Sequence, residues 1–126
     1  MARILIVDDD ADIREAVRDL LVGCGHAVLQ AENGAVGLEQ LSNNSVDLVL
    51  MDILMPTKEG IETIQEIRRA LPDTKILAMS GCPAKHTYLS FAKSFGVNQV
   101  LTKPFAPARL LEAIGSVLTH PSQMDS

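Results

Sequence analysis

The sequence predicts an α/β fold in which one parallel β-sheet is covered by helices on both faces. Five short strand-like segments alternate along the chain with segments of helical periodicity, and nothing repeats internally. Three of the strand-like segments are almost wholly apolar, which is typical of strands buried on both faces. Strict alternation of this kind requires parallel strands and right-handed crossovers. Because the chain has only 126 residues, we expect a single doubly wound domain.

The predicted strands fall into a central and an edge group. Three segments are nearly unbroken apolar runs and are predicted as central strands, at residues 3–7, 46–51 and 75–79. Residues 26–31 and 97–102 are also strand-like, but polar residues such as Gln30 and Asn98 interrupt them. Because an edge strand keeps one side near water, we place these two at the edges of the sheet.

Five helices are predicted between and after these strands. Apolar residues recur at helical spacing in residues 13–21, 61–71 and 110–118, and more weakly in residues 35–41 and 84–95. The first of these stripes places the charged residues of its helix, including Arg14 and Arg18, on the side away from the core.

Composition excludes several classes of function. The chain is 47% hydrophobic, too apolar for disorder, and its 11 basic and 16 acidic residues give a formal net charge of −5. This balance repels nucleic acid and anionic membranes, so we expect neither as a direct partner. No uncharged apolar run approaches the ~18 residues that span a bilayer, and we expect a cytoplasmic protein. Residues 120–126 are expected to form a polar C-terminal tail.

Carboxylates gather at the ends of two predicted strands. Asp8, Asp9 and Asp10 follow the first strand, and Asp52 ends the third. Ligands of open α/β sheets bind beyond the carboxyl ends of the strands, so we expect these residues to converge. Asp10 or Asp12 is expected to cap the following helix. The remaining carboxylates would repel one another unless they bind a proton or a cation.

A hard divalent cation suits this set of oxygen ligands. Mg²⁺ binds one or two carboxylates, accepts a backbone carbonyl and keeps waters that a phosphoryl group can replace. Lys103 follows the fifth strand and supplies a positive charge, and Ser80 ends the fourth and supplies a hydroxyl donor. The grouping favours phosphoryl transfer, which depends mainly on positioning and charge neutralisation.

The motifs at these strand ends resemble those of the receiver domains of two-component response regulators, including the single-domain chemotaxis type. They are Ile-Val-Asp-Asp ending at Asp9, Leu-Met-Asp-Ile-Leu-Met-Pro around Asp52, Gly60, Met-Ser-Gly around Ser80 and Lys-Pro-Phe from Lys103. The resemblance covers residues 2–118. It implies a flavodoxin-like sheet of five strand–helix units in the order 2-1-3-4-5, with residues 1–119 as the receiver domain.

The resemblance also implies roles for the acidic residues. Asp52 would accept a phosphoryl group from a histidine kinase or a phosphorelay phosphotransfer protein, and would also contact the metal. Asp9 would bind Mg²⁺ directly, and Asp8 partly through water. The backbone carbonyl of Leu54 would be the third protein ligand. The acyl phosphate on Asp52 is easily hydrolysed, which suits a resettable signal.

The same resemblance implies how the signal leaves the domain. Ser80 and Lys103 would bind the phosphoryl oxygens, and a cis Lys103–Pro104 peptide would aim the lysine into the site. The fourth helix, fifth strand and fifth helix would form the surface that binds a downstream protein. We expect a monomer or a phosphorylation-linked dimer. The protein would catalyse only its own phosphorylation and dephosphorylation, and would not be an enzyme for a diffusible substrate.

Three positions depart from the family pattern. Val100 stands where many receivers carry an aromatic ring that moves inward on activation, and a β-branched aliphatic side chain cannot act by ring rotation. Leu54 and Cys82, two residues after the acceptor aspartate and after Ser80, are poorly suited to hold an attacking water by hydrogen bonding. We therefore expect slower self-dephosphorylation than in receivers with amide or acidic side chains at these positions.

Three other functions compete with this interpretation. A haloacid-dehalogenase-type phosphohydrolase would use Asp8 as nucleophile and Asp10 as acid, but would leave Asp52 without a comparable role. A flavodoxin-like cofactor carrier would need a phosphate cradle rich in Ser, Thr and Gly, where this chain has aspartates. A pseudo-receiver, which binds partners without phosphorylation, is favoured only by Val100.

Overall fold

The computed structural model of the chain describes residues 2–53, 58–80 and 96–119. In chain order the elements are β1 (Arg3–Val7), α1 (Ala11–Gly23), β2 (Ala27–Ala31), α2 (Gly34–Asn43), β3 (Leu48–Asp52), α3 (Lys58–Ala70), β4 (Lys75–Ser80), β5 (Gln99–Thr102) and α5 (Pro107–Thr119). The helix predicted at residues 84–95 and the tail predicted at residues 120–126 lie outside the described residues.

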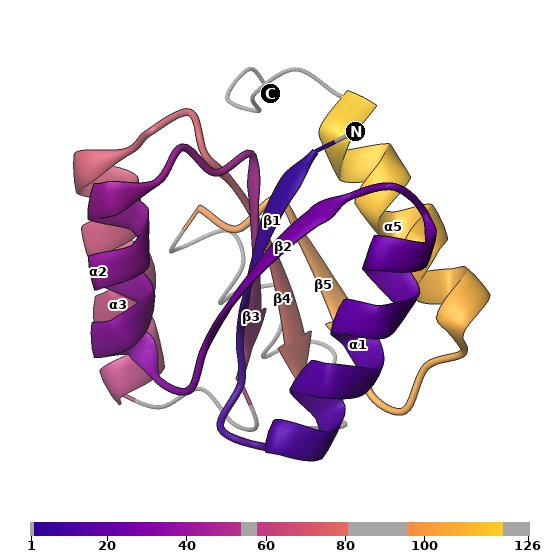
Figure 1. Cartoon of the computed structure of the whole chain (residues 1–126). Helices are drawn as coiled ribbons and strands as arrows, with labels where there is room; N and C mark the ends of the chain where they lie inside the picture. Colours follow the sequence, from indigo (N-terminus) through magenta and orange to yellow (C-terminus); the bar gives the residue numbers. More distant parts are fainter. Residues whose placement is uncertain (1, 54–57, 81–95, 120–126) are drawn as a thin grey trace.

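The strands form one sheet in the order β2-β1-β3-β4-β5, and every neighbouring pair is parallel. The predicted doubly wound sheet and its strand order are therefore confirmed (Figure 1). β2 and β5 occupy the two edges, as their interrupted apolar patterns predict. Their residues are mostly half-buried, whereas the apolar residues of the central strands are buried almost completely.

Two strands begin two residues later than their apolar patterns predict. β3 begins at residue 48 rather than 46, and β5 at residue 99 rather than 97. The residue before each strand accepts, through its side chain, a backbone N–H from the neighbouring strand. If the strand began earlier, one of its backbone carbonyls would accept that N–H instead. Asp47 Oδ2 accepts the Arg3 N–H at 2.8 Å, and Asn98 Oδ1 accepts the Ile76 N–H at 2.8 Å. These side chains end the regular ladder at the amino ends of the strands.

The alternation of side chains along each strand divides the core into two layers. Ile4 and Ile6 of β1 face α1 and α5, and form one hydrophobic cluster with them. Leu5 and Val7 of the same strand face α2 and α3, and form a second cluster. Figure 1 shows the two pairs of helices on opposite faces of the sheet. No helix in the described part of the chain is long and apolar enough to cross a membrane.

The parallel register brings the carboxyl ends of the strands to one edge of the sheet. Val7, the last residue of β1, pairs with Ala31 of β2 and Met51 of β3. Asp52 at the end of β3 pairs with Met79 of β4. Ser80 of β4 pairs with Thr102 of β5, so residues at or just after the ends of β1, β3 and β5 emerge at the same edge.

Candidate functional site

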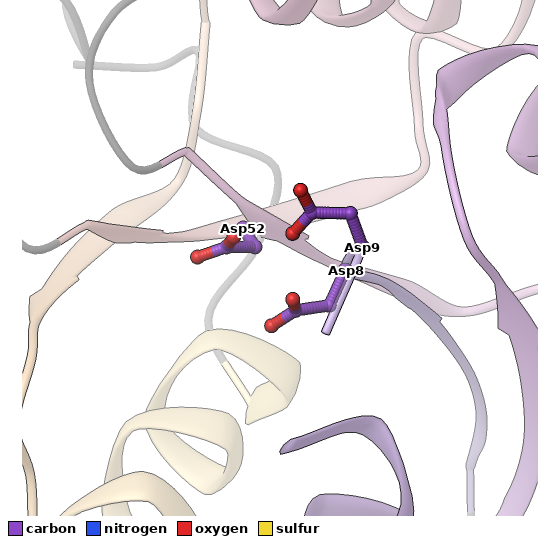
Figure 2. Close-up of side chains that lie close together, drawn as sticks. All are labelled: Asp8, Asp9 and Asp52. Atoms are coloured by element: carbon purple, nitrogen blue, oxygen red, sulfur yellow. The ribbon is translucent and has the colours of Figure 1, made fainter. Parts of the chain in front are cut away.

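Three carboxylates come together where β1 and β3 end (Figure 2). Asp8 and Asp9 directly follow β1, and Asp52 is the last residue of β3. One carboxylate oxygen of each residue lies within 4.8 Å of those of the other two. The structure thus places Asp52 beside Asp8 and Asp9, which lie more than forty residues before it in the sequence.

Lys103, which follows β5, reaches into this acidic cluster. Its Nζ lies 2.6 Å from Asp52 Oδ1 and 3.7 Å from Asp8 Oδ2, and its side chain is 19% exposed. The Lys103–Pro104 peptide is cis, as the family resemblance implied. One ammonium therefore faces two of the three clustered carboxylates, and the cluster keeps an excess of negative charge.

The two buried carboxylates are incompletely compensated. The side chain of Asp8 is fully buried and that of Asp52 is 9% exposed. Among the described residues, no group donates a well-formed hydrogen bond to Asp8 Oδ2 or Asp52 Oδ1, although the Lys103 ammonium faces both. Burial raises the pKa of Asp8, while the N–H of Asp10, 2.9 Å from Asp8 Oδ1, acts in the opposite direction. Both oxygens therefore keep lone pairs for a positively charged ligand.

This set of ligands fits Mg²⁺. The cluster offers only oxygen atoms, two of them in a buried setting with unused lone pairs. Asp9, in contrast, is exposed, so solvent waters can complete an octahedral shell beside it. The surplus negative charge favours a divalent cation over a second ammonium.

Asp10 is not part of the acidic cluster. Its Oδ1 accepts the N–H groups of Asp12 at 3.0 Å and Ile13 at 3.3 Å, and it forms the N-cap of α1. The capping prediction is therefore confirmed for Asp10. The carboxylate of Asp10 is thus bound to the start of α1. This position does not suit the general acid that a phosphohydrolase would require of Asp10.

The remaining site residues are only partly covered by the structure. The backbone of Ser80 ends β4 and pairs with Thr102 of β5, at the same edge as the acidic cluster. Its side chain, like Leu54 and Cys82, lies outside the described residues. Their roles stay predictions from the sequence.

Arg14 belongs to the surroundings of the site, and its predicted place on the solvent side of α1 is wrong. Its side chain is half-buried, and Nη1 donates to the backbone carbonyl of Asp8 at 2.6 Å. Nε donates to Gln30 Oε1 of β2 at 3.3 Å. The signal in the sequence was its position: Arg14 follows Ile13 of the apolar stripe, in the first turns of the helix, next to the strand ends.

The sheet order and the acidic cluster at its carboxyl edge define the class of this protein, a receiver-type α/β domain. Residues 4–115 match the family described as the response regulator receiver domain. The chemotaxis protein CheY of Bacillus subtilis (strain 168) is 39% identical over 117 residues, which cover 92% of this chain and 97% of that protein. CheY of Thermotoga maritima is 35% identical over 116 residues, covering 91% and 96% of the two chains. The chain therefore belongs to the response regulator receiver domain family.

A solved structure gives the same result. The response regulator TrrA of Thermotoga maritima, in complex with Mg(2+)-BeF, superposes with a TM-score of 0.81 at 34% identity, covering 94% of this chain and 100% of that one. Receiver domains are signalling modules of two-component systems rather than enzymes for diffusible substrates. They bind Mg²⁺ at an acidic pocket and interact with histidine kinases or phosphotransfer proteins. Membership of this family excludes the phosphohydrolase and the cofactor carrier as alternatives.

Proposed function

We propose that this chain is a phosphorylation-dependent signalling receiver, which accepts a phosphoryl group on Asp52 from a histidine kinase or a phosphotransfer protein. The observation that carries the proposal is the position of Asp52 beside the Lys103 ammonium, at 2.6 Å, in a cluster with Asp8 and Asp9. The pseudo-receiver alternative loses support, because the acidic and basic groups needed for phosphorylation are all present and close together.

The chemistry follows from the carboxylate of Asp52. One of its oxygens attacks the phosphorus atom, the new P–O bond forms, and the bond from phosphorus to the donor's imidazole nitrogen breaks. The electron pair of that bond returns to the imidazole, which can take up a proton. Lys103, already 2.6 Å from Asp52, pairs with the phosphoryl oxygens as their charge arrives on the domain. Its ammonium offsets part of that charge throughout the transfer.

Asp8, Asp9 and Asp52 hold Mg²⁺ in this proposal, with the backbone carbonyl of Leu54 as a further ligand. Bound Mg²⁺ supplies positive charge that neutralises the phosphoryl oxygens and orients them for in-line transfer. Asp8 contributes partly through water. Its buried oxygen, which accepts no hydrogen bond from the described residues, is the atom that a cation or its water would satisfy.

Phosphorylation changes the surface for a downstream protein. Ser80 at the end of β4 binds a phosphoryl oxygen, and the response reaches β5, α5 and the predicted helix of residues 84–95. Val100 in β5 is half-buried and packs against the cluster under α2 and α3. A β-branched side chain cannot act by ring rotation. The response therefore passes by shifts of the backbone and of packed side chains, in a monomer or a phosphorylation-linked dimer.

Labelling with acetyl phosphate tests the proposal. With Mg²⁺, the wild-type protein is expected to gain one phosphoryl group by intact mass, and peptide mapping should place it on Asp52. Asp52→Asn should abolish labelling, and so should chelation of Mg²⁺ by EDTA. Asp19→Asn, which removes an exposed carboxylate of α1 outside the site, is the matched control and should label normally. Absence of labelling in the wild type, with the cognate kinase as well, would support the pseudo-receiver.

The lifetime of the phosphorylated protein gives a second test. Leu54→Asn places an amide where the family carries water-holding side chains, and we expect it to shorten the lifetime severalfold because the amide can orient the attacking water. Leu54→Met keeps an apolar side chain of similar volume and should leave the lifetime unchanged. Loss of label after acetyl phosphate is removed measures both. Equal lifetimes in the wild type and Leu54→Asn would contradict the role given to this position.

A further inference from the structure

The loop that carries the acidic residues is held by a side chain that touches none of their carboxylates. Arg14 of α1 donates from Nη1 to the carbonyl oxygen of Asp8 at 2.6 Å, and from Nε to Gln30 Oε1 of β2 at 3.3 Å. One guanidinium therefore joins the start of α1 and the edge strand β2 to the end of β1. The 2.6 Å distance lies just below the usual range of a charge-assisted N–H···O hydrogen bond, about 2.7–2.9 Å.

The carbonyl that Arg14 holds belongs to the peptide that links Asp8 to Asp9. A peptide unit is planar, so a fixed carbonyl also fixes the N–Cα bond of the next residue and leaves rotation about that bond as the one backbone freedom that directs its Cβ. The Asp8 end is secured independently, since its N–H donates to the Ala31 carbonyl at 3.1 Å. Asp10 is secured as the N-cap of α1. Asp9 lies between these two anchors, and its exposed side chain follows the peptide that Arg14 holds.

We propose that Arg14 is a positioning residue for the divalent cation: it fixes the Asp8–Asp9 peptide and thereby directs the carboxylate of Asp9 toward Asp52. This inference rests on the proposed function in one respect, the identity of the ligand as Mg²⁺. Groups that orient metal ligands without touching the metal typically change metal affinity by about 10- to 100-fold when they are removed.

The charge and the geometry of Arg14 act in opposite directions on cation binding. A positive charge close to the pocket repels Mg²⁺, so removal of the charge alone would strengthen binding. Loss of the two hydrogen bonds would release the Asp8–Asp9 peptide and weaken binding. Arg14→Lys separates the two effects, because lysine keeps the charge but cannot donate to both acceptors from one planar group.

Titration of the full chain with Mg²⁺ alone, followed by calorimetry, tests the proposal. We expect Arg14→Lys to weaken Mg²⁺ binding about tenfold. The matched control is Arg18→Lys, one turn further along α1, where the side chain is 47% exposed and paired with Asp19. Its Mg²⁺ affinity should equal that of the wild type. Equal affinities in Arg14→Lys and Arg18→Lys would overturn the proposal.

A second measurement in EDTA does not depend on the metal. The Asp10 amide donates to Asp8 Oδ1 at 2.9 Å, so its hydrogen exchange reports the order of this loop. We expect faster exchange at Asp10 in Arg14→Lys than in Arg18→Lys, with unchanged exchange in the strands. Unchanged exchange at Asp10 would overturn the positioning role. If the wild type failed to bind Mg²⁺, the proposed function would fail, and the exchange result would still decide whether Arg14 orders the loop.

A third variant guards against a folding defect in Arg14→Lys. Gln30→Met removes the acceptor on β2 but leaves Arg14 and its bond to the Asp8 carbonyl in place. We expect it to weaken Mg²⁺ binding by a smaller factor than Arg14→Lys. Binding as weak as in Arg14→Lys would contradict the dominant role given to the Asp8 carbonyl.

Discussion

The polar groups at the amino ends of the strands, here called the amino edge of the sheet, differ in their hydrogen bonding from those at the carboxyl ends, the carboxyl edge. At the edge formed by the amino ends of the strands, Arg68 of α3 donates to four oxygen atoms: the carbonyls of Gly96, Pro72 and Thr74, and Oδ1 of Asn98, at 2.5–3.1 Å. At the carboxyl edge, Asp8 Oδ2 and Asp52 Oδ1 are buried without a well-formed hydrogen bond from the described residues.

The difference follows from what each edge has to do. The hydrogen bonds of Arg68 join α3 to the loop before β4 and to the turn before β5. All of their acceptors are protein oxygens. Internal hydrogen bonds of this kind stabilise the fold. Oxygens that bind a cation must instead keep unused lone pairs, and among the described residues only the Lys103 ammonium approaches Asp8 Oδ2 and Asp52 Oδ1. The carboxyl edge is therefore less stable than it would be if its buried oxygens accepted internal hydrogen bonds. Such a loss of stability is common at functional sites.

The largest effect on stability is expected at the amino edge. Arg68→Ala removes all four hydrogen bonds from a half-buried guanidinium and should lower the free energy of unfolding by about 3 kcal/mol. Urea denaturation measures the change. Arg69→Ala removes an exposed arginine of the same helix and should change the free energy by less than about 0.5 kcal/mol. Similar losses in both variants would show that the contacts of Arg68 contribute little.

At the carboxyl edge, we expect a substitution to raise stability instead of lowering it. Asp8→Asn removes one of three clustered negative charges, while its amide oxygen can still accept the Asp10 N–H. In EDTA, we expect the free energy of unfolding to rise by about 1.5 kcal/mol. Added Mg²⁺ should stabilise the wild type more than Asp8→Asn, because the variant has lost a ligand. A metal-free Asp8→Asn protein less stable than the wild type would contradict this account of the edge.

The pH dependence of stability supplies an independent check on Asp8. Burial raises its pKa in the folded protein, so the folded state binds this proton more tightly than the unfolded chain does. In EDTA, the contribution of Asp8 to stability should therefore fall as the pH rises from the ordinary aspartate pKa, about 3.9, through the raised value. The difference between the wild type and Asp8→Asn should widen over this interval. A constant difference would show that Asp8 titrates alike in both states.

Much of the fold and the centre of the site could be predicted from the sequence, because local patterns encode them. Buried parallel strands appear in the sequence as apolar runs. The polar residues that interrupt the segments 26–31 and 97–102 correctly predicted that these two strands lie at the outer positions of the sheet. Asp8 and Asp52 stand directly at the ends of such runs, so the topology alone brought them together.

Arg14 and Arg68 could not be predicted in the same way. Both donate to backbone carbonyls of other elements, and a carbonyl acceptor leaves no mark on the identity of its residue. A charged residue beside an apolar stripe also looks the same in the sequence whether it points to solvent or folds over a strand end. The late starts of β3 and β5 were missed for a related reason, since Asp47 and Asn98 act through side-chain bonds across the sheet.

The smallest expected effect tests whether removing a carboxylate changes stability in opposite directions at the amino edge and at the carboxyl edge. Asp47 at the amino edge accepts the Arg3 N–H at 2.8 Å in an exposed position, so its bond stabilises the fold only modestly. Asp47→Ala should lower the free energy of unfolding by about 0.7 kcal/mol, and Asp47→Asn, which keeps an acceptor, by less. The change is opposite in sign to that of Asp8→Asn, although both substitutions remove one negative charge from the same sheet. Stabilisation by Asp47→Asn equal to that by Asp8→Asn would mean that net charge, rather than the local bonding of each carboxylate, sets the stability of this domain.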